Sequence, residues 1–166
     1  MDKSMRRYMK VGLILHMAYP ELGGGEGPFL DRLMNVVSDP YFEAVEVARI
    51  KDESVRKEAA RLIRTSRLSV AYGGQSRTLS SGLNINDLDE AGRKMAVETL
   101  KEGIDEAYEL GCVGFSFLSG HWAEETKESS FKQLLQSTKE LCSYAKSKGY
   151  MTVCCEVFDY DIHKKA

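Results

Sequence analysis

One carboxylate, Glu156, lies at the end of a mostly apolar run near the C-terminus. The run covers residues 151–157 and follows Gly149. A continuous run of this kind is typical of a parallel strand buried on both faces, where both alternating sets of side chains avoid water. A carboxylate in such a place needs a metal ion, a Lys or Arg, or hydrogen-bond donors to offset the loss of hydration. Glu156 is therefore the first candidate for chemistry.

Polar residues also accompany the other segments that we expect to be strands. His16 lies at the end of the first segment, and Glu46 lies in the middle of the second. Gln75 follows the third segment, and His121 and Trp122 follow the fourth. Each also has a purely structural interpretation. His16 would be a partly buried histidine, Glu46 would pair with an ion on a neighbouring strand, and the other three would belong to surface loops.

Hydrophobic patterning predicts five strands and four helices that alternate along the chain. The expected strands are residues 11–17, 44–50, 68–72, 112–118 and 151–157. The expected helices are residues 28–38, 53–65, 127–148, and one that begins at Asp87 or Asp89 and ends at Leu110. Pro28 suits a first helical position, Asp52 suits an N-cap, and Gly111 and Gly149 suit helix C-termini.

This alternation favours a parallel sheet with helical crossovers. Residues 18–27 form an expected mobile loop after the first strand, and residues 75–86 form a long polar loop after the third. The connections from helix to strand are short by comparison. Long loops at the carboxyl ends of parallel strands mark the functional side of a barrel or a doubly wound sheet.

Composition sets the broad class of the protein. A chain of 166 residues suits a single domain, residues 1–166, and its apolar content of 43% suits a globular core. The formal charge of −2 gives no electrostatic footprint for nucleic acid. We expect no membrane span, because no apolar stretch is long enough. Residues 1–10 are basic, but the apolar segment after them is too short for a signal sequence, so we expect a short arm.

Four cysteines are present, and no two have the spacing of a CxxC motif. They are Cys112, Cys142, Cys154 and Cys155. We interpret them as buried thiols of a cytoplasmic protein, with a zinc site as the alternative.

The stretch from Asn86 to Asp159 carries a pattern of helix and strand endings. A long helix bearing Arg93 ends in the sequence IDEAYELG and leads to a strand that closes in Ser119-Gly120. The next helix ends in AKSKG and leads to the strand that closes in Glu156. The VEV sequence around Glu46 fits as well. This pattern resembles the sugar isomerase/epimerase superfamily with the xylose-isomerase-like TIM barrel.

The resemblance implies an α/β fold built from the parallel (β/α) repeats of a TIM barrel. Eight strands with their helices take about 250 residues, so the chain corresponds to a barrel truncated after strand five. In this family a divalent ion is held by carboxylates and a histidine from strands five to eight, and Mn²⁺, Mg²⁺, Zn²⁺ or Co²⁺ would suit. Glu156 corresponds to the strand-five ligand and to a catalytic residue in proton transfer through an enediolate.

The resemblance also implies substrate contacts for a sugar or sugar phosphate. His16 and Gln75 would contact hydroxyl groups, and Arg77 would reach a hydroxyl or a phosphate. His121 and Trp122 would form a wall for the sugar ring. Asp159 would support the metal site or cap a helix. Ketose 3-epimerisation, aldose–ketose isomerisation and dehydration of a cyclic polyol all stay open.

Five parallel strands cannot close into a barrel, so we expect a homo-oligomer or a fragment of a longer chain. A truncated barrel that binds a ligand or an assembly partner without catalysis is the main alternative. An abasic-site endonuclease is disfavoured, because three histidines and a charge of −2 do not suit a histidine-rich cluster in a basic groove. A flavodoxin-like domain is disfavoured because no helix follows the fifth strand and no short phosphate loop follows the first.

Overall fold

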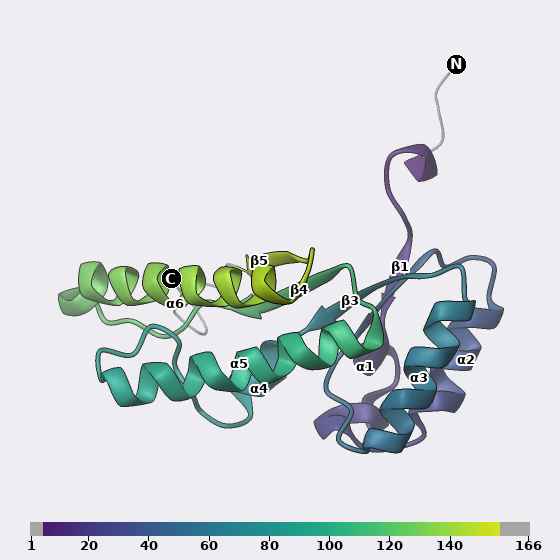
Figure 1. Ribbon diagram of the computed structural model, residues 1–166, viewed down its shortest axis with the longest axis horizontal. Coiled ribbons are helices and arrows are strands. Elements are labelled where there is room, and N and C mark those ends of the chain that lie inside the picture. Colours follow the sequence, from purple (N-terminus) through teal and green to yellow (C-terminus); the bar gives the residue numbers. More distant parts are fainter. Residues whose placement is uncertain (1–4, 157–166) are drawn as a thin grey trace.

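The structure is a computed structural model, and it describes residues 5–156. Its centre is a parallel sheet of five strands in chain order, β1-β2-β3-β4-β5 (Figure 1). The strands are β1 (Gly12–Ile14), β2 (Ala44–Val47), β3 (Ser69–Gly73), β4 (Gly114–Leu118) and β5 (Thr152–Glu156). Each strand pairs in parallel with the next along the chain. This simple order, with a helix in each longer connection, is that of consecutive barrel repeats.

Four longer helices pack one against the next beneath the sheet (Figure 1). They are α2 (Phe29–Ser38), α3 (Glu53–Thr65), α5 (Glu90–Leu110) and α6 (Lys127–Lys148). The Asp52 carboxylate accepts hydrogen bonds from the N–H groups of Ser54 and Val55 and thereby caps α3. Gly111 ends α5 with a φ of 75°, a left-handed conformation that suits glycine. The predicted bounds of α3 and α6 are confirmed.

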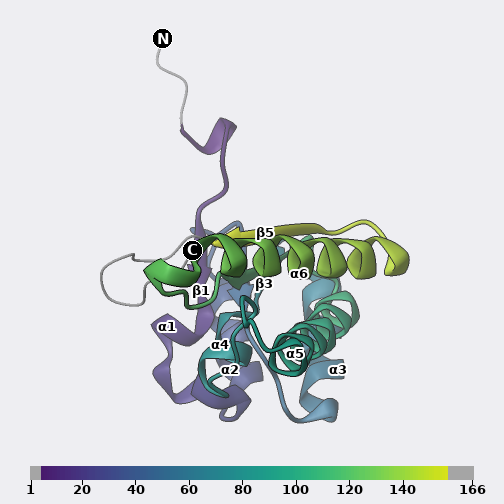
Figure 2. The ribbon, with the colours of Figure 1, turned by 90° about the vertical axis from the view of Figure 1, so that its left-hand side faces the viewer.

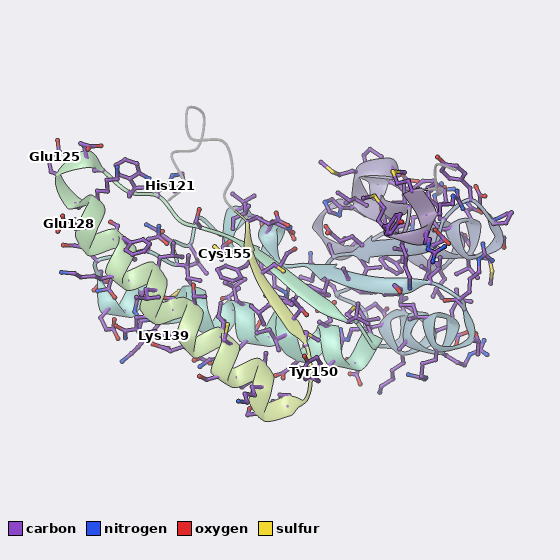
Figure 3. All side chains as sticks on the ribbon, turned by 90° about the horizontal axis from the view of Figure 1, so that it is seen from above. His121, Glu125, Glu128, Lys139, Tyr150 and Cys155 are labelled. Carbon is purple, nitrogen blue, oxygen red and sulfur yellow. The ribbon has the colours of Figure 1, made fainter. Side chains whose placement is uncertain are left out.

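The two faces of the sheet differ in what covers them. On β2, the side chains of Val45 and Val47 are buried on the face of the sheet that the helices cover. Ala44 and Glu46 on the opposite face are half-exposed. Figure 3 looks onto that opposite face and shows β4 and β5 with no helix in front of them. We call this opposite face the inner face, because it corresponds to the interior of a barrel. It carries a hollow of about 330 Å³ lined in part by Ile14, Ala44 and Ala71.

Several expected elements differ from the structure, among them the second strand, which was predicted to reach residue 50 but ends as β2 at Val47. The first strand is shorter than predicted, since β1 ends at Ile14 and the helix α1 (Leu15–Ala18) follows at once. The predicted mobile loop holds the 3₁₀ segment η2 (Pro20–Gly25), and the predicted polar loop after β3 begins with the helix α4 (Gln75–Leu79). Short apolar runs do not distinguish a strand from a helix by periodicity alone, which explains the difference in the first strand.

The fifth strand is not buried on both faces as predicted. In the described residues β5 pairs with β4 alone, so it forms an edge of the sheet (Figure 2). Thr152 and Cys154 on its inner face are exposed. The expectation of buried thiols is correct for Cys112 but wrong for Cys142, Cys154 and Cys155, which are exposed. Residues 157–166, including Val157 and Asp159, lie outside the described residues.

The described helices include none long and apolar enough to cross a membrane.

Candidate active site

The side chains of Gln75 and Glu156 meet at the carboxyl edge of the sheet. The amide nitrogen Nε2 of Gln75 lies 3.0 Å from both carboxylate oxygens of Glu156 and 2.9 Å from the hydroxyl oxygen of Ser116. An amide group has two hydrogens to donate, so one serves Ser116 and the other is shared across the carboxylate. These three residues come from β5, β4 and the first position of α4, and together they form the centre of the candidate site.

A glycine makes room for this arrangement. A Cβ atom at Gly73, the last residue of β3, would lie 2.6 Å from the amide oxygen Oε1 of Gln75 and 2.6 Å from Oε1 of Glu46. Both oxygens therefore converge on the space above Gly73. The N–H₂ group of the Gln75 amide faces Glu156, and its oxygen and Oε1 of Glu46 both lie next to Gly73.

Glu46 is a second acidic residue of this edge. Burial raises the pKa of the Glu46 carboxyl, and the negative charge of Glu156 raises it further. The structural interpretation predicted an ion pair for Glu46, but residues 5–156 show none. The Glu46 side chain instead lies in the half-exposed inner face, where its ionisation is disfavoured.

The end of β3 directs Gln75 toward its neighbours. The N–H of Gly74 donates to the carbonyl oxygen of Ser116 at 2.8 Å. A Cβ atom at Gly74 would lie 2.6 Å from the ring of Phe115, so the chain can pass this close to β4 only without a side chain. Helix α4 then begins at Gln75, next to β4.

Arg77, two residues later, anchors the opposite side of α4. Its guanidinium is buried, donates to the hydroxyl of Tyr72 at 3.0 Å, and forms an ion pair with Glu106 of α5. Glu106 in turn accepts a hydrogen bond of 2.6 Å from the N–H of Ile50. The prediction that Arg77 reaches a substrate is therefore wrong, because this side chain lies on the helix-covered side of the sheet and ties α4 to α5.

His121 lies in the connection after β4, which two asparagines hold in place. Asn86 Oδ1 accepts the N–H of Gly120 at 3.1 Å, and Asn84 Nδ2 donates to the carbonyl oxygen of His121 at 3.1 Å. The imidazole of His121 is exposed on the same connection. Trp122 is half-buried, and the ammonium group of Lys127 lies 4.9 Å from its ring centroid.

His16 is placed in helix α1 rather than at a strand end. Its side chain is half-buried, and burial lowers the pKa of the imidazole. Its ring nitrogen Nδ1 has no hydrogen-bond partner among the described residues. Within residues 5–156, no hydrogen bond or ion pair joins His16 to Gln75 or Glu156. Of the predicted site residues, the structure thus brings Gln75 and Glu156 into direct contact.

Sequence reasoning missed Ser116, Gly73 and Asn86. Ser116 could have been found, because it alternates with Phe115 and Phe117 along β4 and must face the side opposite to theirs. The amide of Asn86 is buried, but its partner Gly120 is far away in the sequence, so no local pattern indicates the contact.

The described residues do not form a complete metal site. Glu156 and Glu46 offer hard oxygen ligands that suit a divalent cation. Within residues 5–156, however, no group of three or more His, Cys, Asp or Glu side chains is placed to hold a metal ion.

The family of this chain follows from its similarity to known proteins. A family model described as a xylose isomerase-like TIM barrel matches residues 38–163, which is most of the chain. The chain belongs to this family. The match covers β2 to β5 and every site residue described above except His16. A comparison with curated proteins gave no significant match.

Solved structures of the same fold include proteins of several described activities. The chain is similar to an L-ribulose 3-epimerase, with a TM-score of 0.73 and 19% identity over 90% of this chain and 50% of that one. It is similar to the IOLI protein with a bound zinc atom, with a TM-score of 0.66 and 15% identity over 90% of this chain and 51% of that one. It is also similar to a family 2 AP endonuclease from Brucella melitensis, with a TM-score of 0.67 and 14% identity over 95% of this chain and 58% of that one.

At these identities the similarity shows the fold of this family member. The chain spans about half the length of the solved structures that it matches. The described residues hold five parallel strands, whereas a closed barrel of this class has eight.

Proposed function

We propose that this chain forms part of a metal-dependent sugar or sugar-phosphate isomerase or epimerase. The observation that carries the proposal is the position of Glu156, at the carboxyl edge of β5, hydrogen-bonded to Gln75 and close enough to Glu46 to raise its pKa. Active sites of TIM barrels lie at this edge. Membership of the family and the structural likeness to a 3-epimerase support the same assignment.

In this proposal Glu156 takes part in proton transfer at the carbon next to a carbonyl group. Removal of that proton leaves an enediolate, and return of a proton to the other face or to the neighbouring carbon gives the epimer or the isomer. In an epimerisation one carboxylate cannot serve both faces of the carbon, so that reaction requires a second acid. Glu46 is the other acidic side chain that the described residues place near Glu156.

Glu156 is also the proposed ligand of the divalent ion, which would be Mn²⁺, Mg²⁺, Zn²⁺ or Co²⁺. The remaining ligands would come from residues outside the described part, in a longer chain or in a partner chain. Gln75, His16, His121 and Trp122 are the proposed contacts of the sugar, and the first of these already lies beside Glu156.

The test measures metal content and turnover together. The purified protein and its Glu156→Gln variant are assayed for bound Mn²⁺ or Zn²⁺ and for epimerisation or isomerisation of a panel of ketoses, aldoses and their phosphates. Bound metal near one per chain, lost in the variant together with turnover, is the expected result. No metal after soaking and no turnover would contradict a working site in this protein.

A non-catalytic binding or assembly module is the second candidate. The uncovered inner face, with its hollow of about 330 Å³, favours this alternative. The two candidates differ in one measurement, because a binding module would take up a sugar or a partner chain and leave the sugar unchanged.

A further inference from the structure

We infer that Gln75 is a positioning residue that fixes the orientation of the Glu156 carboxylate at the strand end. This inference rests on the proposed function, in which Glu156 acts on the substrate. It assigns to Gln75 a role through Glu156, in addition to the proposed contact with a sugar hydroxyl.

The first support is the geometry of the contact. The Nε2 atom of Gln75 is equidistant from the two oxygens of Glu156, at 3.0 Å each, so the amide faces the middle of the carboxylate. A donor in this position opposes rotation of the carboxylate in either direction. Glu156 accepts no other side-chain hydrogen bond among residues 5–156.

The second support is that Gln75 is itself held. Its other amide hydrogen is directed to Ser116 at 2.9 Å, which fixes the N–H₂ end of the amide. Its backbone begins α4, and the buried Arg77–Glu106 ion pair holds that helix to α5. A side chain fastened at both ends orients its neighbour more firmly than a mobile one, because less conformational entropy is lost in each contact.

The third support is the space above Gly73. The Oε1 atom of Gln75 occupies that space, 2.6 Å from where a Cβ atom would lie, so the amide can take this orientation only because residue 73 is a glycine. The same space admits Oε1 of Glu46. The close packing beside Gly73 therefore leaves the oxygen of the Gln75 amide on this side and its donor side toward Glu156.

The contact is tested with a double-mutant cycle in urea unfolding. The variants are Gln75→Leu, Glu156→Leu and the double variant. Coupled residues give a double variant that loses less stability than the sum of the two single losses. The control is Gln136→Leu combined with Glu156→Leu, because the Gln136 amide donates to Glu140 on the exposed face of α6, and here the losses should add. Additive losses in the Gln75 cycle would overturn the inference.

The contact is tested a second time by exchanging the two side chains. Gln75→Glu places two carboxylates in contact and should lower the urea midpoint, and adding Glu156→Gln restores a donor–acceptor pair and should raise it again. The exchanged pair has no carboxylate at position 156, so its readout is stability and not turnover. A urea midpoint that stays as low as that of Gln75→Glu would overturn the inference.

A crystal structure of Gln75→Leu gives a readout that does not depend on turnover. We expect the Glu156 carboxylate to adopt more than one orientation or a new one. An unchanged, single orientation would overturn the inference. If the wild-type protein shows no turnover and binds no divalent ion, the proposed function fails, while the cycle and the crystal structure still decide whether Gln75 orients Glu156.

Discussion

The amide of Gln75 donates to both carboxylate oxygens of Glu156, although the two residues are 81 positions apart in the sequence. The contact joins the connection after β3 to the last residue of β5 and crosses β4 by way of Ser116. It depends on the register of three strands, since Gly73 pairs with Ser116 and Leu118 pairs with Glu156. The carboxyl edge of the sheet is thus a connected polar network and not a row of separate loop residues.

We predict that Gly73→Ala disturbs this network. The added methyl group would lie 2.6 Å from Oε1 of Glu46 and of Gln75, so one of these side chains must move. Because both atoms are the ends of flexible side chains, we expect a loss of unfolding free energy at the low end of the range of about 1–3 kcal/mol for overpacking, and urea unfolding measures it. Gly114→Ala on the same inner face is the control, because its nearest contact would be the carbonyl oxygen of Thr152 at 3.7 Å. Equal costs at the two glycines would contradict the prediction.

Local sequence signals predicted the helices better than the site. The bounds of α3 follow from the Asp52 cap and the apolar spacing, and both act within one helix. The predicted end of the first strand was wrong because Leu15 and His16 fit a helix as well as a strand. Gln75 and Glu156 were both chosen, but their contact could not be predicted, because it depends on the pairing of strands distant in sequence.

Arg77 shows most clearly what the local sequence does not predict. A single arginine in a polar stretch was interpreted as a ligand contact, which is not correct, because Arg77 is buried and paired with Glu106. Its partner Glu106 lies on the buried side of α5, and only the packing of α5 against α4 brings the two together. A charged residue in a short helix therefore takes its role from the neighbouring element, which the local sequence does not specify.

We predict that Glu106→Gln is strongly destabilising. The change leaves the buried guanidinium of Arg77 without its main counter-ion, and breaking a buried pair by removal of one partner costs about 3–5 kcal/mol. Lys57→Ala, which removes an exposed pair with Glu53, is the control and should change the stability very little, because water screens such a pair. Similar urea midpoints for the two variants would show that the Arg77–Glu106 pair is not maintained in solution.

Glu46 should make stability depend on pH. Its pKa in the folded protein is raised above 4.5, so the folded state holds the proton more tightly than the unfolded state. The stabilisation is complete below pH 4.5 and is lost as the pH rises through the raised pKa. Glu46→Gln should therefore gain stability relative to the wild type between pH 4 and pH 8, measured in EDTA. The exposed Glu58→Gln should show no such gain, and a constant difference at all pH values would contradict the prediction.

The thiols should react at very different rates. Cys142 and Cys154 are exposed, whereas Cys112 is buried, and burial raises the pKa of its thiol to about 12. A thiol reacts through its thiolate, so we expect Ellman's reagent to modify Cys142 and Cys154 rapidly and Cys112 only after unfolding. Variants with one Cys→Ser substitution each show which thiol gives which phase of the reaction. Modification of Cys112 at the rate of the exposed thiols in the native protein would contradict its burial.

The inner face should drive association between copies of the chain or with the strands of a partner. Ala44 and Ala71 lie half-exposed beside the hollow, and β1 and β5 are both edges of the described sheet. Open edges and uncovered apolar faces favour pairing with another chain. We predict a species larger than a monomer in gel filtration with light scattering, and a shift toward monomer in Ala71→Lys, which places a charge on that face.

The control variant is Thr65→Lys, at the exposed end of α3. It adds the same charge away from the inner face and should leave the assembly unchanged. A monomeric wild type that binds no apolar dye would show that the inner face is covered in solution.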